Sequence, residues 1–156
     1  MTRRFVFVAL LALALAVPAL VMAQTPNFTG KWVQDMEKSD PAPQGRGPAG
    51  PQTLTLTQTA ADLTIERETQ NGVMKTVYKL DGSPSVNAGG RGGEVTSKTV
   101  WEGAKLVTKY SRTMGETTVE VIETRSLEAD GTLVVVTAMK GGPMGDTTRK
   151  TVFKKG

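Results

Sequence analysis

The stretch TLTLTQTAADLTIERE, residues 53–68, decides the fold class of this chain. Its first half alternates Leu54 and Leu56 with threonines, and its second half puts Leu63 and Ile65 on one face and polar side chains on the other. Alternation with a period of two is typical of strands that cover a core on one side. This stretch therefore predicts two strands joined by a short turn.

The same alternation recurs before and after this stretch, at residues 28–34, 73–80, 95–101, 105–112, 117–127, 132–140 and 146–155. Most connections between the later segments are short and contain Gly or Asp, which suit tight hairpin turns. No segment after the apolar leader shows a convincing helical period. We therefore predict an all-β, antiparallel meander of about eight or nine strands that closes into a small barrel, because closure removes free edge strands. An open two-sheet sandwich is the alternative.

Two segments interrupt the alternation. Residues 37–52, EKSDPAPQGRGPAGPQ, are dominated by proline and glycine, and residues 81–94, DGSPSVNAGGRGGE, are rich in glycine. Both compositions predict loops rather than strands or helices.

The first 23 residues have the pattern of a secretory signal peptide. Arg3 and Arg4 precede a long apolar run, and small residues lead to a cleavage position after Ala23. A membrane anchor is the alternative, although Pro18 interrupts the run. We expect export to the periplasm or outside the cell, one domain over residues 24–156, and no membrane anchor after cleavage.

The composition excludes several kinds of site. The chain has neither cysteine nor histidine, which excludes disulfides, thiol nucleophiles, Ser-His-Asp triads and the usual zinc sites. Nineteen basic residues less the two in the leader leave 17 against 15 acidic residues, and they are scattered. Nucleic-acid binding normally requires a concentrated basic patch. We therefore expect no enzyme activity, no cofactor, no metal and no nucleic-acid partner.

The segment Phe28-Thr29-Gly30-Lys31-Trp32 resembles the glycine–any–tryptophan signature of the calycin group, the lipocalins and fatty-acid-binding proteins. In that group the tryptophan of the first strand closes one end of the barrel, and the glycine lets the backbone bend. A basic side chain of the last strand often packs on the tryptophan. The chain also resembles a group of small exported bacterial proteins with a lipocalin-like barrel. Both resemblances imply such a barrel here, in which Gly30 and Trp32 are structural.

The C-terminal half resembles the later hairpins of the fatty-acid-binding proteins, in which two arginines and a tyrosine hold a ligand carboxylate. Arg125-Ser126-Leu127 falls at the first of these places, with Ser126 where an acidic residue stands in the family. Arg149-Lys150-Thr151 falls at the second, with Thr151 where the tyrosine stands. The resemblance implies that Arg125 and Arg149 bind a ligand.

The residues themselves leave the roles of both arginines open. If the apolar face of residues 117–127 points inward, alternation points Glu123 and Arg125 inward too. They could form a structural ion pair, Arg125 could bind a ligand, or a bulge could leave both in water. Arg149 could anchor a ligand or pack on Trp32, and we favour the packing.

Three aromatic residues, Tyr78, Tyr110 and Trp101, are predicted to face inward, as core residues or as walls of a pocket. We predict a non-enzymatic binding protein for a small apolar or amphipathic molecule, with an anionic head group if Arg125 binds it. The alternative is an envelope or surface module with a solid barrel, which binds protein or polysaccharide through the loops 37–52 and 83–94.

Overall fold

The computed structural model describes residues 25–42, 50–89, 93–143 and 145–156. The predicted signal peptide, residues 1–23, lies outside these ranges, as do parts of both predicted loops. Within the described ranges there is no helix with the length and hydropathy needed to cross a membrane.

The described residues form ten antiparallel strands and no helix. The strands are β1 (Gly30–Asp35), β2 (Thr53–Gln58), β3 (Asp62–Thr69), β4 (Gly72–Lys79), β5 (Ser85–Ala88), β6 (Glu94–Glu102), β7 (Lys105–Met114), β8 (Thr117–Leu127), β9 (Leu133–Lys140) and β10 (Thr147–Lys155). The prediction of an all-β meander is confirmed. The prediction of eight or nine strands is wrong by one, because β5 lies inside the segment 81–94 that we interpreted as a loop.

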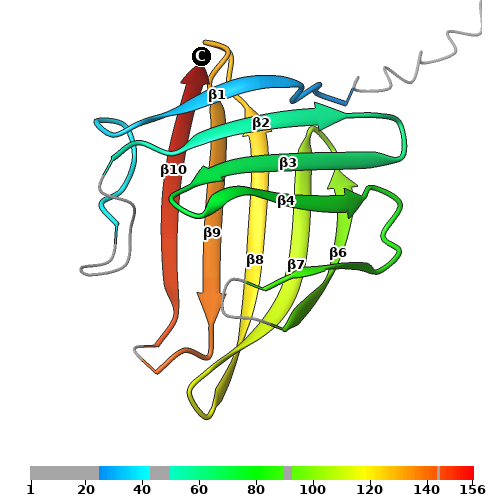
Figure 1. Cartoon of the computed structure of the whole chain (residues 1–156), viewed down its shortest axis with the longest axis vertical. Coiled ribbons are helices and arrows are strands. Elements are labelled where there is room, and N and C mark those ends of the chain that lie inside the picture. The colour runs from blue at the N-terminus through cyan, green and yellow to red at the C-terminus, as the bar shows by residue number, and fades with distance from the viewer. Residues whose placement is uncertain (1–24, 43–49, 90–92, 144) are drawn as a thin grey trace, which may run out of the picture.

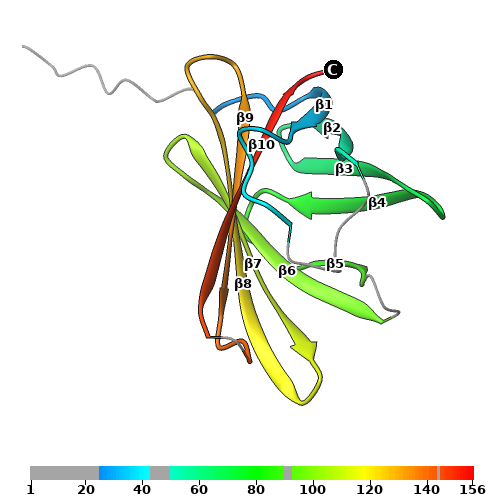
Figure 2. The same cartoon turned by 90° about the vertical axis from the view of Figure 1, so that its left-hand side faces the viewer.

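The strands follow the order β4-β3-β2-β1-β10-β9-β8-β7-β6-β5, so the chain meanders except where β1 pairs with β10. Figure 1 shows β1 to β4 crossing β7 to β10 at a steep angle, and Figure 2 shows these two layers from the side. The single sheet therefore curls over itself into a nearly closed barrel whose two edge strands are β4 and β5.

Side chains rather than a backbone ladder join these two edges. The Asn87 side chain accepts a hydrogen bond from the Val77 N–H (2.8 Å) and donates one to the Val77 carbonyl (2.9 Å). The Ser85 hydroxyl accepts a hydrogen bond from the Lys79 N–H at 2.8 Å. Polar groups that an edge strand would leave exposed are thereby paired. The polar side chains that make β5 look like a loop in the sequence are the ones that connect it to β4.

One end of the barrel is filled by an apolar cluster. Leu54, Leu56, Leu63 and Ile65 are all buried, as their alternation predicts. The other buried members of the cluster are Phe28, Trp32, Leu80, Leu106, Leu133 and Phe153. Burial of such side chains stabilises the fold by about 1.5–3 kcal/mol each, so this cluster is the main source of stability in a chain without disulfides.

Trp32 is fully buried in this cluster, and its indole N–H donates a hydrogen bond to the Phe28 carbonyl at 2.8 Å. Gly30 has a φ of 141°, a backbone angle that residues with a Cβ rarely adopt. This conformation leads the chain into β1. Gly30 therefore begins β1, and Trp32 lies in the cluster that fills one end of the barrel.

The expected packing of Arg149 on Trp32 is wrong. The basic residue of β10 that lies over the indole ring is Lys155, whose Nζ is 4.2 Å from the ring centroid. The register of β1 and β10 pairs Trp32 with Lys155. Arg149 lies six positions away, which is about 20 Å along a strand, too far to reach the ring.

Candidate functional site

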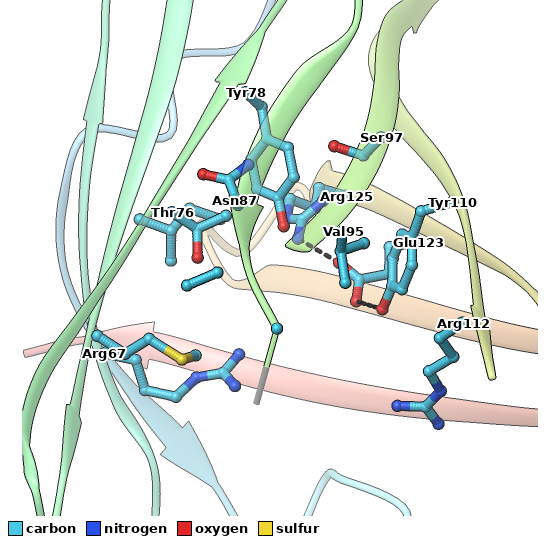
Figure 3. Close-up of a pocket in the computed structure, with 14 residues that line it drawn as sticks. Arg67, Thr76, Tyr78, Asn87, Val95, Ser97, Tyr110, Arg112, Glu123 and Arg125 are labelled. Carbon is cyan, nitrogen blue, oxygen red and sulfur yellow. Dashed lines mark hydrogen bonds and ion pairs between the residues drawn. The ribbon is translucent and has the colours of Figure 1, made fainter. Parts of the chain in front are cut away.

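A partly open pocket of about 270 Å³ occupies the barrel interior beyond the apolar cluster. Figure 3 shows its polar side chains converging from several strands. Its lining comes from six strands and from Gly89, the residue that follows β5. The strand residues are Ile65 and Arg67 (β3), Met74, Thr76 and Tyr78 (β4), Asn87 and Ala88 (β5), Val95 and Ser97 (β6), Tyr110 and Arg112 (β7), and Glu123 and Arg125 (β8). Ile65 also belongs to the apolar cluster, so the pocket begins where that cluster ends.

The inner wall of the pocket carries an ion pair between Glu123 and Arg125. The side chain of Arg125 is 6% exposed and that of Glu123 19% exposed, so both charges are largely removed from water. Tyr110 donates a hydrogen bond from its hydroxyl to Glu123 Oε1 at 3.0 Å, and the Arg125 guanidinium lies 5.3 Å from the Tyr78 ring centroid. Of the three alternatives that the sequence left open for these two residues, the structure shows the ion pair.

Two threonines extend this polar contact deeper into the barrel. Arg125 donates from Nη1 to the Thr108 hydroxyl at 3.2 Å, and the Thr108 and Thr99 hydroxyls lie 2.9 Å apart. The registers of β6 with β7 and of β7 with β8 set Thr99 opposite Thr108 and Thr108 opposite Glu123. Cross-strand pairing therefore builds a continuous hydrogen-bonded network across three strands.

The network fixes the protonation states of its members. Burial pushes the pKa of Glu123 upward, but the charge of Arg125 and the hydrogen bonds from Tyr110 and Arg125 outweigh it, so its pKa is lowered. Burial, with the charge of Glu123 and the hydrogen bond to it, raises the pKa of Tyr110 well above its usual value. Burial also raises the pKa of Tyr78. At neutral pH the network therefore contains one carboxylate, one guanidinium and two neutral phenols.

Two further arginines line the pocket, and sequence reasoning missed both. Arg67 of β3 is half-buried, and its Nε is buried without a hydrogen-bond partner among the described residues. Arg112 of β7 is exposed, and its one side-chain hydrogen bond to a described residue goes to the thioether of Met139, a weak acceptor, at 3.0 Å. Strand alternation contained the signal for both. Arg67 follows Leu63 and Ile65 on the inward face of its strand, and Arg112 follows Tyr110 by two positions.

The structure brings together three of the five residues predicted to bind a ligand, namely Tyr78, Tyr110 and Arg125. Trp101 is not among the pocket's lining residues, because its ring stacks on Phe28 at the apolar end, with centroids 5.6 Å apart and planes at 17°. Arg149 does not line the pocket either. Its Nη2 donates to the Asp40 carbonyl oxygen at 3.5 Å, and its Nε is buried without a hydrogen-bond partner among the described residues. Whether the three pocket residues bind a ligand stays a prediction.

The pocket offers little to a metal ion. The described residues contain no group of three or more His, Cys, Asp or Glu side chains that could hold one. Glu123 is the single carboxylate in the described lining, and it is already paired with Arg125. The arrangement is suited instead to a molecule that combines an apolar body with hydrogen-bond acceptors or negative charge.

Comparison with solved structures identifies the fold. The structure of zebrafish ileal bile acid-binding protein complexed with cholic acid matches with a TM-score of 0.63 and 18% identity, over 83% of this chain and 98% of that one. This chain has a calycin-like fold. A REP1-NXSQ fatty acid transporter matches its calycin-like barrel with a TM-score of 0.63 and 14% identity, over 82% of this chain and 95% of that one. A point mutant of that transporter matches with a TM-score of 0.60.

The likeness is one of structure rather than of sequence. A scan against protein-family models gave no match, and a search of curated protein sequences gave none. The calycin-like chain therefore shares with these neighbours the course of its strands, while the residues that line its pocket have to be interpreted on their own chemistry.

Proposed function

We propose that this calycin-like chain is an exported, non-enzymatic binding protein that holds a small amphipathic anion inside its barrel. The observation that carries the proposal is the pocket lined by Tyr78, Tyr110, the Glu123–Arg125 pair and two further arginines. Apolar side chains and ring faces supply contact area there, and guanidinium groups supply charged donors.

The size of the pocket favours a small ligand over a solid barrel. Its volume of about 270 Å³ equals about nine water molecules at their share of liquid volume. Ligand sites usually measure about 300–1,000 Å³, so this pocket lies just below that range and suits a small molecule. The alternative of a solid barrel that binds partners through its loops predicts a filled interior, and this cavity counts against it.

The charge of the pocket favours an anion. Arg67, Arg112 and Arg125 contribute three positive charges to the lining, and Glu123 contributes one negative charge. In a partly enclosed site such an excess attracts negatively charged molecules more strongly than it would on an open surface. The apolar lining, Ile65 included, would receive the hydrophobic part of the ligand.

A binding role is also favoured over catalysis. A general acid–base pair requires two groups with separated pKa values facing one substrate. The described lining of the pocket has one carboxylate, that of Glu123. Arg125 keeps this carboxylate ionised and engages it in an ion pair. The names of the neighbours support the same class of function, since one is a bile acid-binding protein and another a fatty acid transporter.

Native mass spectrometry of the protein purified without denaturant tests the proposal. We expect a bound small molecule, or a mass shift after addition of octanoate, octyl sulfate or octyl phosphate. The variant Thr76→Trp places a large ring in the pocket and should abolish the shift. Thr55→Trp, on an exposed position of β2, is the matched control and should retain it. A wild-type protein that carries no molecule and shifts with none of the three amphiphiles contradicts the proposed function.

The export part of the proposal rests on the pattern of residues 1–23, and it has its own test. Expression of the full chain with its leader should yield an extracytoplasmic protein whose first residue is Gln24. Recovery of the uncleaved chain in the membrane fraction would favour the membrane anchor instead.

A further inference from the structure

We propose that Arg67 and Arg112, rather than Arg125, bind the anionic group of the ligand. The inference rests on the proposed function and adds to it where the charged end of the ligand lies. It differs from the assignment that the family resemblance implies, in which Arg125 and Arg149 would hold a carboxylate.

Arg125 already has its partners. Glu123 neutralises its charge, Thr108 accepts one of its hydrogen bonds, and Tyr78 covers one face of the guanidinium. An incoming anion that approached Arg125 would also approach the carboxylate of Glu123, and two anions close together in a poorly solvated site repel each other. Arg125 is therefore a structural member of the wall and a poor anchor for a second negative charge.

Arg67 and Arg112 have no such neutralising partner. All fifteen acidic residues of the chain lie in the described ranges. In those ranges only Glu123 and Asp130 form ion pairs, with Arg125 and Lys38 respectively. No carboxylate therefore pairs with either of the two arginines. The buried Nε of Arg67 also lacks an acceptor among the described residues, and an unpaired buried donor is costly until a partner arrives.

The two arginines line the same pocket. They come from β3 and β7, and Figure 3 shows Arg67 and Arg112 on opposite sides of the view, with the Glu123–Arg125 pair above and between them. Arg112 is exposed and Arg67 is half-buried, whereas Arg125 is buried. Arg67 and Arg112 are therefore closer to solvent than Arg125 is. A ligand held by both would keep its charged end near the opening and insert its apolar part toward Tyr78.

This geometry defines the class of ligand. Planar guanidinium groups donate paired hydrogen bonds to carboxylate, sulfonate, sulfate and phosphate oxygens. The pocket volume limits the apolar part to a short chain or a small ring system. The ligand is thus a small amphiphile with one terminal oxyanion.

Two fluorescent probes that differ by one oxyanion test the inference. Anilinonaphthalene sulfonate carries a sulfonate, and N-phenylnaphthylamine has the same rings without it. We expect Arg67→Gln and Arg112→Gln each to weaken sulfonate-probe binding by about tenfold, and the double variant to weaken it more than either single variant does. Binding of the neutral probe should change by less than about twofold in each variant, because its contacts are apolar.

Lys109→Gln is the matched control, since Lys109 is exposed on β7 and alternation puts it on the face opposite Arg112. It removes the same charge and should leave both probes unaffected. Near-ultraviolet circular dichroism of each variant checks that the barrel has folded, because a loosened core also binds such dyes. Displacement by octanoate, octyl sulfate and octyl phosphate then ranks the oxyanions.

The outcomes separate the two proposals. If the folded double variant binds the sulfonate probe as tightly as the wild type does, the assignment to Arg67 and Arg112 is overturned while the pocket stands. If all variants, Lys109→Gln included, lose affinity equally, the effect is one of net charge and the assignment is also overturned. If the wild type binds neither probe and none of the amphiphiles, the proposed function fails and this inference fails with it.

Discussion

Glu123 and Arg125 stand two positions apart on β8, and their side chains pair inside the barrel. Strand alternation gives them the same face, and nearly complete burial makes each depend on the other. A buried charge that loses its partner is strongly unfavourable, whereas replacement of a whole pair by apolar groups is often tolerated. The pair therefore affects stability most when it is broken from one side.

Replacement of Glu123 by glutamine should destabilise the protein by about 3 kcal/mol, because it leaves the Arg125 guanidinium buried without a counter-charge. Urea unfolding measures the change. Glu120→Gln, on an exposed position of the same strand, should change stability by less than about 0.5 kcal/mol. Adding Arg125→Met to Glu123→Gln should recover part of the loss. Equal effects of Glu123→Gln and Glu120→Gln would contradict the structural role of the pair.

The same carboxylate predicts a loss of stability in acid. The pKa of Glu123 is lower in the folded chain than its ordinary value, which is about 4.3 in an unfolded chain. Its contribution is therefore fully present above that ordinary value and is lost as pH falls through the lower folded value. The stability difference between wild type and Glu123→Gln should shrink between neutral pH and about pH 3. A difference that stays constant over this range would show that the pKa of Glu123 is the same in the folded and unfolded states.

The alternation in the sequence was sufficient to predict the strands that cover the core. Leu54, Leu56 and Leu63 are buried because a period of two gives them a single face. The alternation was insufficient to predict β5. The polar side chains of Ser85 and Asn87 form hydrogen bonds to β4 across the barrel edge and do not pack in an apolar core. A contact of that kind depends on which strands the curled sheet brings together, and local composition does not record it.

The candidate site was predictable in part for a similar reason. Tyr78, Tyr110 and Arg125 stand out in the sequence as aromatic or inward-phased residues, and they do meet in one pocket. Alternation gives Arg67 the same face as Leu63 and Ile65, but the local sequence does not distinguish an arginine that lines a pocket from one in solvent. The choice between Arg149 and Lys155 as the partner of Trp32 required the register of β1 with β10, which no local pattern contains.

Replacement of Asn87 by alanine should loosen the edge of the barrel. It removes both hydrogen bonds to the Val77 backbone, and each backbone group left without a partner costs about 1 kcal/mol where water does not replace the bond. Hydrogen exchange should become faster at the Val77 amide and remain unchanged at strands far from the edge. Asn71→Ala, in the exposed turn between β3 and β4, should leave the Val77 amide unchanged. An unaffected Val77 amide in Asn87→Ala would mean that the edges are joined in another way.

The contact of Lys155 with Trp32 makes the last prediction. The ammonium group lies 4.2 Å from the ring centroid and also donates a hydrogen bond to the Thr29 carbonyl at 2.8 Å. Lys155→Met removes both interactions and should cost about 1 kcal/mol, because an exposed cation over an aromatic ring contributes about 0.5–1 kcal/mol. Lys154→Met, the neighbouring exposed position on the opposite face, should cost less than about 0.5 kcal/mol.

A double-mutant cycle that combines Lys155→Met with Trp32→Leu separates the ring contact from the hydrogen bond to Thr29. If the ring contact stabilises the barrel end, the two changes together should cost less than the sum of their separate effects. Strictly additive costs would assign the effect of Lys155 to its hydrogen bond alone. Arg149→Met should show no coupling to Trp32, since its position on β10 is about 20 Å from the ring. A coupling of Arg149 with Trp32 as large as that of Lys155 would contradict the observed register of β1 and β10.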